Sequence, residues 1–274
     1  MPEGHTIHRL AREHMQSLVG HVLHVWSPQG RHTVLAAALD QHCLEHVEAH
    51  GKHLFYRWRE APTLHIHLGL FGSFRESVSG SSPPAPSAQL RIEGPSTTVE
   101  LIGASTCELV DSMRRDQILN RLGPDLLDAE ADRDRAWEGL RQRSTLIAAA
   151  LVDQELMSGV GNVYRLEALF VNGIHPERPA NSLSRAEFDA VWATLRSMLR
   201  QGVEARRIVT VHPSERIRAG TDGLESVGPE DAFYVYQQQR CRRCGGPIRA
   251  WRLGARTLYA CERCQPPPPP SGSS

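Results

Sequence analysis

The chain has 274 residues, of which 40% are hydrophobic and 23% charged, and its formal net charge at pH 7 is zero. This composition is typical of a folded protein with two or three modules, and the overall charge gives no sign of a nucleic-acid partner. The longest apolar stretches, such as Leu146–Val152, are too short to cross a bilayer, and the first residues lack the basic segment and apolar core of a secretory signal. We therefore expect a cytoplasmic protein that does not enter membranes.

The first hundred or so residues predict one helix followed by short strands. Apolar residues recur at helical spacing over 6–18, and Gly20 is a stop signal. Strand character follows at His21–Trp26, His53–Trp58, Leu64–Leu68, Gln89–Ile92 and Thr98–Ile102. Many short strands separated by turn-rich pieces predict a β-sandwich or a barrel.

From Leu122 the pattern becomes helical. Ser184 and Glu187 form a capping-box pattern at the start of one expected helix. The expected helices are Arg133–Arg141, Thr145–Met157, Asn162–Phe170 and Ser184–Gln201. The proline run that begins at Pro266 and the closing Ser-Gly-Ser-Ser predict a disordered tail.

Four cysteines near the end of the chain form two C-x-x-C pairs, separated by sixteen residues: Cys241 with Cys244, and Cys261 with Cys264. This spacing lets two knuckles present four thiolates to one Zn²⁺. Disulfides and a redox dithiol are the alternatives. A reducing compartment disfavours the first and the duplicated pair disfavours the second. Because protein ligands fill all four positions, we expect a structural zinc ion rather than a catalytic one.

The same segment is rich in arginine. Between Arg240 and Cys264 there are seven arginines and a single acidic residue, Glu262. A run of this kind is often only a solvated face, but around a metal-site motif it favours a phosphate-binding surface. We expect Arg256, five residues before Cys261, to reach a phosphate group.

Two helical patterns in the middle of the chain flank a turn that contains Gly159 and Gly161. Glycine permits positive φ and the close approach of another backbone. Asn162 then lies at the amino end of the second helix, where free N–H groups and the positive end of the helix dipole favour a phosphate. A helix cap is the commoner role of such glycines, but next to a zinc ribbon the pattern indicates a clamp for a DNA backbone.

Pro2 follows the initiator methionine, and a small second residue generally allows methionine removal. The chain then begins with a secondary amine, whose pKa of about 7.7–8 leaves a substantial unprotonated fraction near neutrality. Such an amine can attack a sugar C1′ and form an iminium that acts as an electron sink. Glu3 lies beside it as a candidate general acid and base. The alternative is that proline and glutamate simply open a helix.

These features, in this order, resemble the formamidopyrimidine-DNA glycosylase/endonuclease VIII family over nearly the whole chain. The motifs are Pro2-Glu3-Gly4, Gly51-Lys52, His67-Leu-Gly-Leu-Phe-Gly72, Leu122-Gly-Pro-Asp125, Asp153-Gln154, Gly159-Val-Gly-Asn162-Val-Tyr164 and Gly173-Ile-His-Pro-Glu-Arg-Pro179, followed by the zinc ribbon. The resemblance implies an α+β fold. We expect an N-terminal helix with a two-layered β-sandwich (1–121), a helix-two-turn-helix domain (122–225), a zinc-ribbon finger (226–265) and the tail (266–274).

The resemblance also implies roles for individual residues. Pro2 is the nucleophile that forms a Schiff base, and Glu3 is the proton donor and acceptor. Lys52 contacts the phosphate on the lesion side and assists catalysis. Two further residues, Asn162 and Arg256, grip phosphates.

Leu70 and Phe71 fall where the family inserts apolar side chains into the gap left by an everted nucleotide, which offsets part of the cost of flipping. Ordinary core packing is the alternative for these two residues. The glycines on either side, Gly69 and Gly72, favour an exposed loop tip.

The chain also departs from the family pattern. Thr6 stands where the family often has a second glutamate, His5 replaces the usual neighbour, and Gly69 replaces a polar gap-filler. The Arg-Arg-Phe-Gly signature of the formamidopyrimidine branch is absent near Met113–Asp116, and Arg206–Asp231 lacks the glycine-rich lesion-capping loop of that branch. These absences indicate the endonuclease VIII branch, in its actinobacterial-type subgroup, and oxidised pyrimidines as substrates.

Twelve of the fourteen histidines lie within the first 67 residues, at irregular spacing. For them we expect surface and packing roles rather than metal binding. Cys43 and Cys107 stand alone and are expected to be small buried side chains.

The function implied is a bifunctional DNA glycosylase/AP lyase of base excision repair that acts on damaged DNA as a monomer, cleaves by β,δ-elimination and, in a bacterium, is associated with the nucleoid. Two alternatives stay open. One is a catalytically weak or inactive paralogue that binds lesions or single strands, and the other is a zinc-ribbon factor of transcription or the ribosome.

Overall fold

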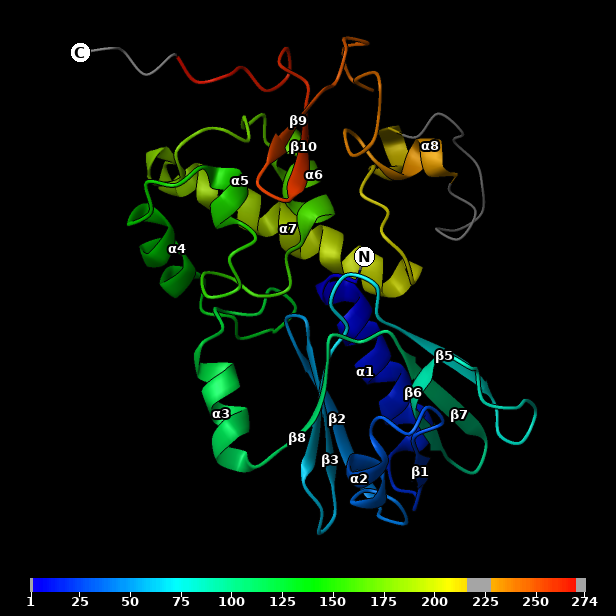
Figure 1. Cartoon of the computed structure of the whole chain (residues 1–274). Coiled ribbons are helices and arrows are strands. Elements are labelled where there is room, and N and C mark those ends of the chain that lie inside the picture. Colours follow the sequence, from blue (N-terminus) through cyan, green and yellow to red (C-terminus); the bar gives the residue numbers. More distant parts are fainter. Residues whose placement is uncertain (1, 216–227, 270–274) are drawn as a thin grey trace. The chain divides into compact units, whose positions relative to one another are not determined.

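The computed structural model of the chain describes residues 2–215 and 228–269. It divides into two compact units, Met1–Arg121 and Leu122–Ser274, drawn together in Figure 1. Among the described residues, no helix is both long and apolar enough to cross a membrane.

The first unit is a β-sandwich with one long helix. One antiparallel sheet has the strand order β1-β6-β7-β5 and the other the order β2-β3-β4-β8. The fold class predicted for this part of the chain is thus confirmed, with a sandwich rather than a barrel. The strands are β1 (His24–Trp26), β2 (Leu44–His50), β3 (His53–Trp58), β4 (Thr63–His67), β5 (Ser73–Val78), β6 (Ala88–Glu93), β7 (Thr97–Ile102) and β8 (Thr106–Val110).

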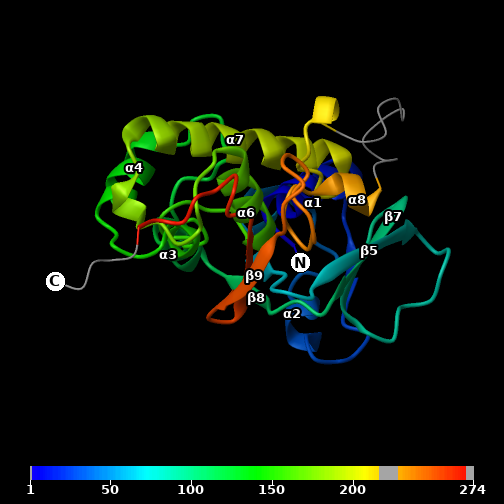
Figure 2. The ribbon, with the colours of Figure 1, turned by 90° about the horizontal axis from the view of Figure 1, so that it is seen from above.

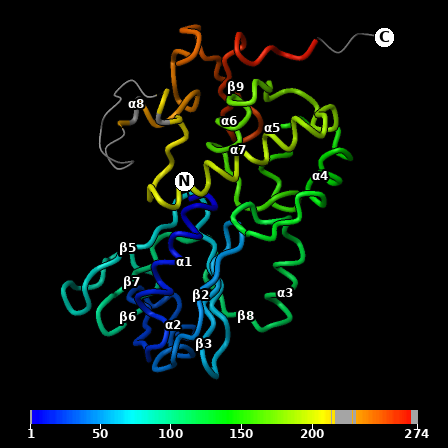
Figure 3. The backbone as a smooth tube through the Cα atoms, turned by 180° about the vertical axis from the view of Figure 1, so that it is seen from behind, coloured from blue at the N-terminus to red at the C-terminus, as the bar shows by residue number. Residues whose placement is uncertain are grey.

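Helix α1 (Gly4–Leu18) packs against this sandwich along β2 (Figure 3). Its apolar stripe, including Ile7 and Leu10, joins the inward-facing residues of both sheets in one core. The sulfur of Met15 accepts a hydrogen bond from the backbone N–H of Val47 at 3.0 Å. Two smaller helices complete the unit, α2 (Thr33–Ala37) and α3 (Ser112–Asn120).

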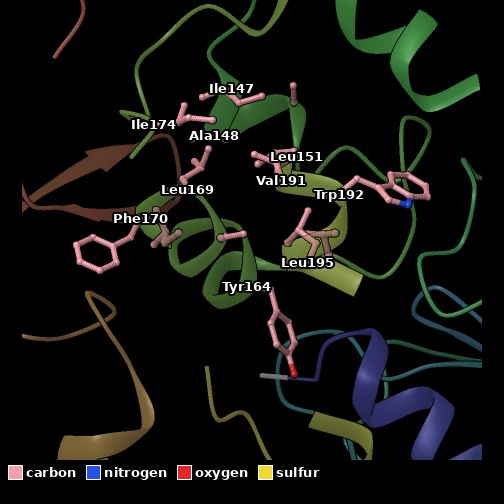
Figure 4. Close-up of a cluster of buried hydrophobic side chains, with 14 of the residues drawn as sticks. Ile147, Ala148, Leu151, Tyr164, Leu169, Phe170, Ile174, Val191, Trp192 and Leu195 are labelled. Carbon is pink, nitrogen blue, oxygen red and sulfur yellow. The ribbon is translucent and has the colours of Figure 1, made fainter. Parts of the chain in front are cut away.

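The second unit is built around helices α6 (Asn162–Val171) and α7 (Arg185–Ala205). Figure 2 shows the long α7, with α4 (Arg133–Arg141) beside its beginning. Side chains from α6, α7 and the segments before α6 meet in a continuous apolar core (Figure 4). The capping box at Ser184 and Glu187 is present as predicted. The shorter helices are α5 (Ile147–Ala150), η1 (Ala180–Ser182), η2 (Pro213–Glu215) and α8 (Pro229–Ala232).

The end of the second unit forms a two-stranded hairpin of β9 (Arg249–Leu253) and β10 (Arg256–Ala260). The hairpin lies between the two C-x-x-C pairs in sequence, as a zinc ribbon requires. No helix or strand is found over 266–269, while the rest of the predicted disordered tail lies outside the described residues.

The predicted helix Thr145–Met157 is wrong over most of its length, because only Ile147–Ala150 is helical. Beyond that turn, side chains satisfy the backbone groups that a helix would otherwise pair. The carboxylate of Asp153 accepts from the N–H of Glu155, and the amide oxygen of Gln154 accepts from the N–H of Gly159. Such local bonds compete with a helix and end it here.

Three smaller expectations also change. Gly159 has φ +95°, but Gly161 is an extended N-cap residue at φ −122°, so only the first glycine uses the left-handed region. Cys43 and Cys107 are partly exposed rather than buried. Cys107 lies in β8, an edge strand, and Cys43 directly precedes β2, the opposite edge of the same sheet. An edge position leaves part of a side chain in contact with water.

Candidate functional site

Pro2 and Glu3 directly precede the first turn of α1. Glu3 is the N-cap residue, with extended backbone at φ −121° and ψ 179°, and its side chain makes no capping hydrogen bond. Its carbonyl oxygen accepts from the N–H of Thr6 at 2.9 Å, so the main chain opens the helix. Glu3 is fully buried, whereas Pro2 is half-buried. The helix therefore begins with a buried carboxyl group that is not used as a cap, next to an accessible proline.

His5 adds no positive charge to this end of the helix. Burial, assisted by the charge of Arg9, lowers the pKa of His5 to about 3, so its ring is neutral at pH 7. The positive end of the helix dipole remains, and it lowers the pKa of an amine that lies just before the first turn.

Lys52 lies in the two-residue turn between β2 and β3, where His50 pairs with His53. Gly51, the first residue of the turn, has φ +58°. A positive φ at the first central residue is found in the primed hairpin turns, whose twist matches that of the strands they join. The lysine is therefore held on a tight hairpin, and its side chain is partly exposed.

Leu70 and Phe71 form the tip of a short loop that follows β4. The N–H of Gly72 donates to the carbonyl oxygen of Leu68 at 3.0 Å and closes the loop. A Cβ atom at Gly72 would lie only 2.3 Å from that same oxygen, so no larger residue fits. Leu70 is 58% exposed and Phe71 is 88% exposed, as the flanking glycines predict for a loop tip.

These three segments lie at one end of the sandwich, the upper end of this unit in Figure 1. His53, which follows the lysine turn, pairs with both His50 and His67, the last residues of β2 and β4. Helix α1 also begins at this end of the unit, as Figure 1 shows. The first unit thus gathers the proposed nucleophile, the lysine and the apolar loop from distant parts of the sequence.

In the second unit, Asn162 is the first residue of α6 and is 6% exposed. Its amide nitrogen donates to the carbonyl oxygen of Thr257 in β10 at 3.2 Å. Its amide oxygen accepts from the guanidinium group of Arg165 at 2.5 Å. The buried Arg165 therefore fixes which way the amide of Asn162 faces, and the amide ties α6 to the hairpin.

Arg256 directly precedes Thr257, so this tie brings the two expected phosphate-binding residues to neighbouring positions. Three of the seven arginines in this segment serve the fold itself. Arg242 pairs with the buried Asp231 at 2.7 Å, Arg243 lies over aromatic rings, and Arg249 pairs with Glu262. Arg256 is exposed, and no ion pair joins it to an acid within the described part of the chain.

The four cysteines of the zinc motif lie together, with their sulfur atoms within 4.8 Å of one another. The sulfur of Cys241 is 3.7 Å from that of Cys264, and the sulfur of Cys244 is 3.4 Å from that of Cys261. These distances exceed the roughly 2.05 Å of a disulfide. They agree with the edges, about 3.8 Å, of a tetrahedron of sulfurs around zinc at about 2.3 Å. A hydrogen bond from the backbone N–H of Gly246 lowers the pKa of Cys244 to about 7, whereas burial raises the pKa values of Cys241 and Cys264.

This group of cysteines is the one candidate metal site among the residues that the structure describes. The histidines of the first unit form no such group there. Most of them lie on strands and helices, and they make contacts such as that of His14 with the hydroxyl of Tyr56 at 2.6 Å.

One structural contact near this site escaped the sequence analysis because no motif marks it. The fully buried Glu167 of α6 accepts hydrogen bonds from the hydroxyl of Thr210 and from the N–H groups of Tyr234, Val235 and Tyr236. This carboxylate joins the chain that leaves α7 to the chain that enters the zinc ribbon.

Two other expectations concern the lesion-facing loops. Met113–Asp116, where the Arg-Arg-Phe-Gly signature is absent, lies within helix α3. The region Arg206–Asp231, which lacks a glycine-rich capping loop in sequence, has its central part, 216–227, outside the described residues.

Two family models match the chain. The model described as the formamidopyrimidine-DNA glycosylase N-terminal domain covers residues 1–111, and the model described as the formamidopyrimidine-DNA glycosylase H2TH domain covers residues 122–213. Endonuclease 8 1 of Mycobacterium tuberculosis is 39% identical over 272 residues, which span 97% of this chain and 100% of that protein. The formamidopyrimidine-DNA glycosylase of Thermomicrobium roseum is 31% identical over 253 residues, which span 85% of each chain.

Among solved structures, the fold is similar to that of the Lactococcus lactis Fpg in a complex with abasic-site DNA. The TM-score is 0.79 and the identity 21%, over 97% of this chain and 100% of that chain. This likeness supports the fold, and the sequence relatives support the family. The chain therefore belongs to the formamidopyrimidine-DNA glycosylase/endonuclease VIII family of base-excision-repair DNA glycosylases.

Proposed function

We propose that this protein is a bifunctional DNA glycosylase and AP lyase whose nucleophile is the secondary amine of Pro2. The observation that carries the proposal is the start of α1, where an accessible Pro2 precedes a fully buried Glu3 that does not cap the helix. A residue that only starts a helix has no need of a buried carboxyl group that makes no capping hydrogen bond. A residue that transfers protons does need such a carboxyl group. The positive end of α1 favours an unprotonated amine at neutral pH.

In the proposed reaction the amine nitrogen forms a bond to C1′ of the damaged nucleotide, and the base leaves with the electron pair of the glycosidic bond. Glu3 donates a proton to the ring oxygen as the sugar opens, which gives an iminium at C1′. Loss of a proton from C2′ then expels the 3′ phosphate, and loss of a proton from C4′ expels the 5′ phosphate. Water finally hydrolyses the iminium and restores the free amine.

We propose that damaged DNA is bound through three phosphate contacts and one insertion, by a monomer. Lys52 on its tight turn, and Asn162 and Arg256 on the tied α6 and β10, supply the phosphate contacts. Leu70 and Phe71, whose loop holds them exposed, fill the stack after the nucleotide is flipped. The Lactococcus lactis relative was solved with an abasic site in its DNA, which supports this class of partner.

The residues of the cysteine group fit a single zinc ion, because four thiolates in a tetrahedral arrangement are a preferred ligand set of Zn²⁺. When bound, the metal stabilises the fold of the ribbon and supplies no chemistry to the reaction. Cys241, Cys244, Cys261 and Cys264 hold it, and β9 and β10 between them carry Arg256.

We also propose the division into a sandwich domain, 1–121, a helical domain, 122–225, and a finger, 226–265.

For the substrate we propose oxidised pyrimidines. The 39% identity to an endonuclease 8 protein supports this branch, as does the replacement of the Arg-Arg-Phe-Gly signature by the helical segment Met113–Asp116. A panel of duplexes with one defined lesion each tests the assignment. Faster cleavage of 8-oxoguanine than of oxidised pyrimidines would contradict it.

Borohydride trapping on abasic DNA tests the mechanism. The wild-type protein should form a covalent adduct, and intact-mass analysis should show that Met1 has been removed. Pro2→Ala should abolish the adduct and leave DNA binding within about twofold, because the residue is half-buried and makes no part of the core. Pro28→Ala, at a turn proline between β1 and α2, is the matched control and should trap like the wild type. A wild-type protein that binds DNA without trapping would instead be a lesion-binding paralogue.

A further inference from the structure

The sheet β2-β3-β4-β8 carries a second ordered set of side chains on the face turned away from the sandwich core. Phe55 is buried but lies outside that core, and the ring of His65 stacks on it at 4.8 Å between centroids. The strand register places Phe55 between Glu48 and His65, and His65 next to Glu108. This face is thus a built surface with buried aromatic and titratable groups.

A chain of hydrogen bonds crosses this face. Nδ1 of His65 lies 2.9 Å from Oε1 of Glu108, and Nε2 of His65 lies 2.9 Å from Nδ1 of His53. An ionised carboxylate only accepts, so Nδ1 of His65 carries the hydrogen and its Nε2 carries a lone pair. Nδ1 of His53 must then donate to that lone pair. The chain therefore leaves Nε2 of His53 as an acceptor.

The imidazole rings in this chain are neutral at pH 7. Burial lowers the pKa of His53 to about 3, and burial also lowers the pKa of His65 although Glu108 opposes it. The other charged and titratable groups that face these rings are His50, Lys52, His67, Arg114 and, over the ring of Phe55, Arg115. A neutral ring in this position offers a lone pair rather than a second positive charge.

The neighbouring His67 has the opposite tautomer. The backbone N–H of Gly69, which can only donate, lies 3.2 Å from Nδ1 of His67. Nδ1 of His67 therefore carries a lone pair, and the hydrogen is on Nε2. This bond connects the end of β4 to the start of the loop that bears Leu70.

A lone pair on His53 repels a phosphate oxygen and attracts a hydrogen-bond donor. The adjacent residue, Lys52, is such a donor and lies in the turn that the paired His50 and His53 close. Burial lowers the pKa values of His53 and His67, and the positive charge of Lys52 lowers them further. Lysine has a long, flexible side chain, so an acceptor beside it restricts the positions of its ammonium group.

We propose that Glu108, His65 and His53 form a hydrogen-bond relay that presents the Nε2 lone pair of His53 to the ammonium group of Lys52, and that these three positioning residues hold the lysine for its phosphate contact. The inference rests on the phosphate contact proposed for Lys52. The relay itself exists in the free protein, so it can be tested apart from any activity.

Nitrogen NMR of the imidazole rings tests the relay. In the wild-type protein, His65 and His53 should both carry hydrogen on Nδ1, and His67 on Nε2, at pH 7. Glu108→Ala should let the first two rings revert to the Nε2–H form that free histidine prefers. Glu108→Gln should not, because its amide oxygen still accepts from His65. A wild-type spectrum with hydrogen on Nε2 of His53 would overturn the relay.

Single-turnover trapping on abasic DNA tests the positioning role. Glu108→Ala and His65→Phe, which keeps the stack on Phe55, should each slow trapping about tenfold and weaken DNA binding no more than Lys52→Ala does. Glu108→Gln should stay near the wild type. Glu45→Ala, an exposed glutamate on the same sheet that pairs with Arg59, is the control and should have no effect.

A double-mutant cycle separates positioning from general damage to the fold. If the relay acts through Lys52, adding Glu108→Ala to Lys52→Ala should slow trapping no further. If the effects of the two substitutions on the trapping rate add, or if the single relay variants trap within twofold of the wild-type rate, the positioning role is overturned and the proposed function stays intact. Failure of the wild type to trap would remove the proposed function and the positioning role together, and the NMR spectrum would then still decide whether the relay exists.

Discussion

Replacing Glu167 should destabilise the second unit more than replacing any exposed acid. The side chain is fully buried, and its Oε1 accepts from the N–H groups of Val235 and Tyr236 while its Oε2 accepts from the N–H of Tyr234 and the hydroxyl of Thr210. In Glu167→Gln the amide oxygen still accepts from the N–H groups of Val235 and Tyr236. The amide nitrogen then faces the N–H of Tyr234, which loses its acceptor.

One orphaned buried N–H costs about 1–3 kcal/mol. A loss of about 2 kcal/mol should lower the Tm by about 4–8 °C. In Glu167→Ala three backbone N–H groups lose their acceptor, so we expect a loss of about 3–9 kcal/mol.

Thermal unfolding and hydrogen exchange measure this effect. The amides of Tyr234, Val235 and Tyr236 should exchange faster in Glu167→Ala, and only that of Tyr234 should do so in Glu167→Gln. Glu138→Gln, at a 53% exposed position paired only with Arg141, should change stability by less than about 0.5 kcal/mol. The reasoning is refuted if the Tm of Glu167→Gln lies within about 1 °C of the wild-type Tm and all three amides stay protected from hydrogen exchange. That difference is less than about half the smallest expected shift.

Three further predictions follow from the same contacts. Cys244→Ser should release one zinc ion per chain in metal analysis and weaken DNA binding, because a structural zinc contributes folding free energy directly; full zinc content would contradict this. The hydrogen bond from Arg178 lowers the pKa of Glu187 to about 2 from 4.5, so its contribution to stability is complete above pH 4.5 and lost towards pH 2. The urea midpoints of the wild type and Glu187→Gln should therefore converge on acidification, and a constant gap would refute the assignment. Replacing both Leu70 and Phe71 by alanine should leave the Tm unchanged, since both are exposed, and slow base removal; a lowered Tm would show that they pack instead.

The sequence predicted those strands that lie within the sheets more readily than those at the edges. β3, β4, β6 and β7 were all recognised, and each is an interior strand. The three that escaped recognition, β2, β5 and β8, are edge strands whose residues are largely exposed or half-buried. An edge strand carries charged and polar side chains, so its apolar alternation is weak. The sequence analysis did not predict helix α3 for a related reason, because none of its residues is buried.

The predictable part of the site is the part that short motifs encode. Cys241 and its partners follow from local spacing, since each ligand needs neighbours only a few residues away, whereas Lys52 was identified through the family resemblance. The contacts of Glu167, Arg165 and His65 join residues that are far apart or carry no recurring spacing. They could be found only once the fold had brought the elements together.

The exposed tip of the β4–β5 loop has a consequence for how such a protein searches DNA. Phe71 is 88% exposed in the free chain. Burying a phenylalanine side chain is worth about 2 kcal/mol, which is about 30-fold in an association constant. An intact stack has no room for the ring, so under the proposed insertion this factor is absent on undamaged duplex, where charge attraction alone holds a protein. The proposal that Phe71 inserts therefore implies a longer residence time only at sites where the stack opens.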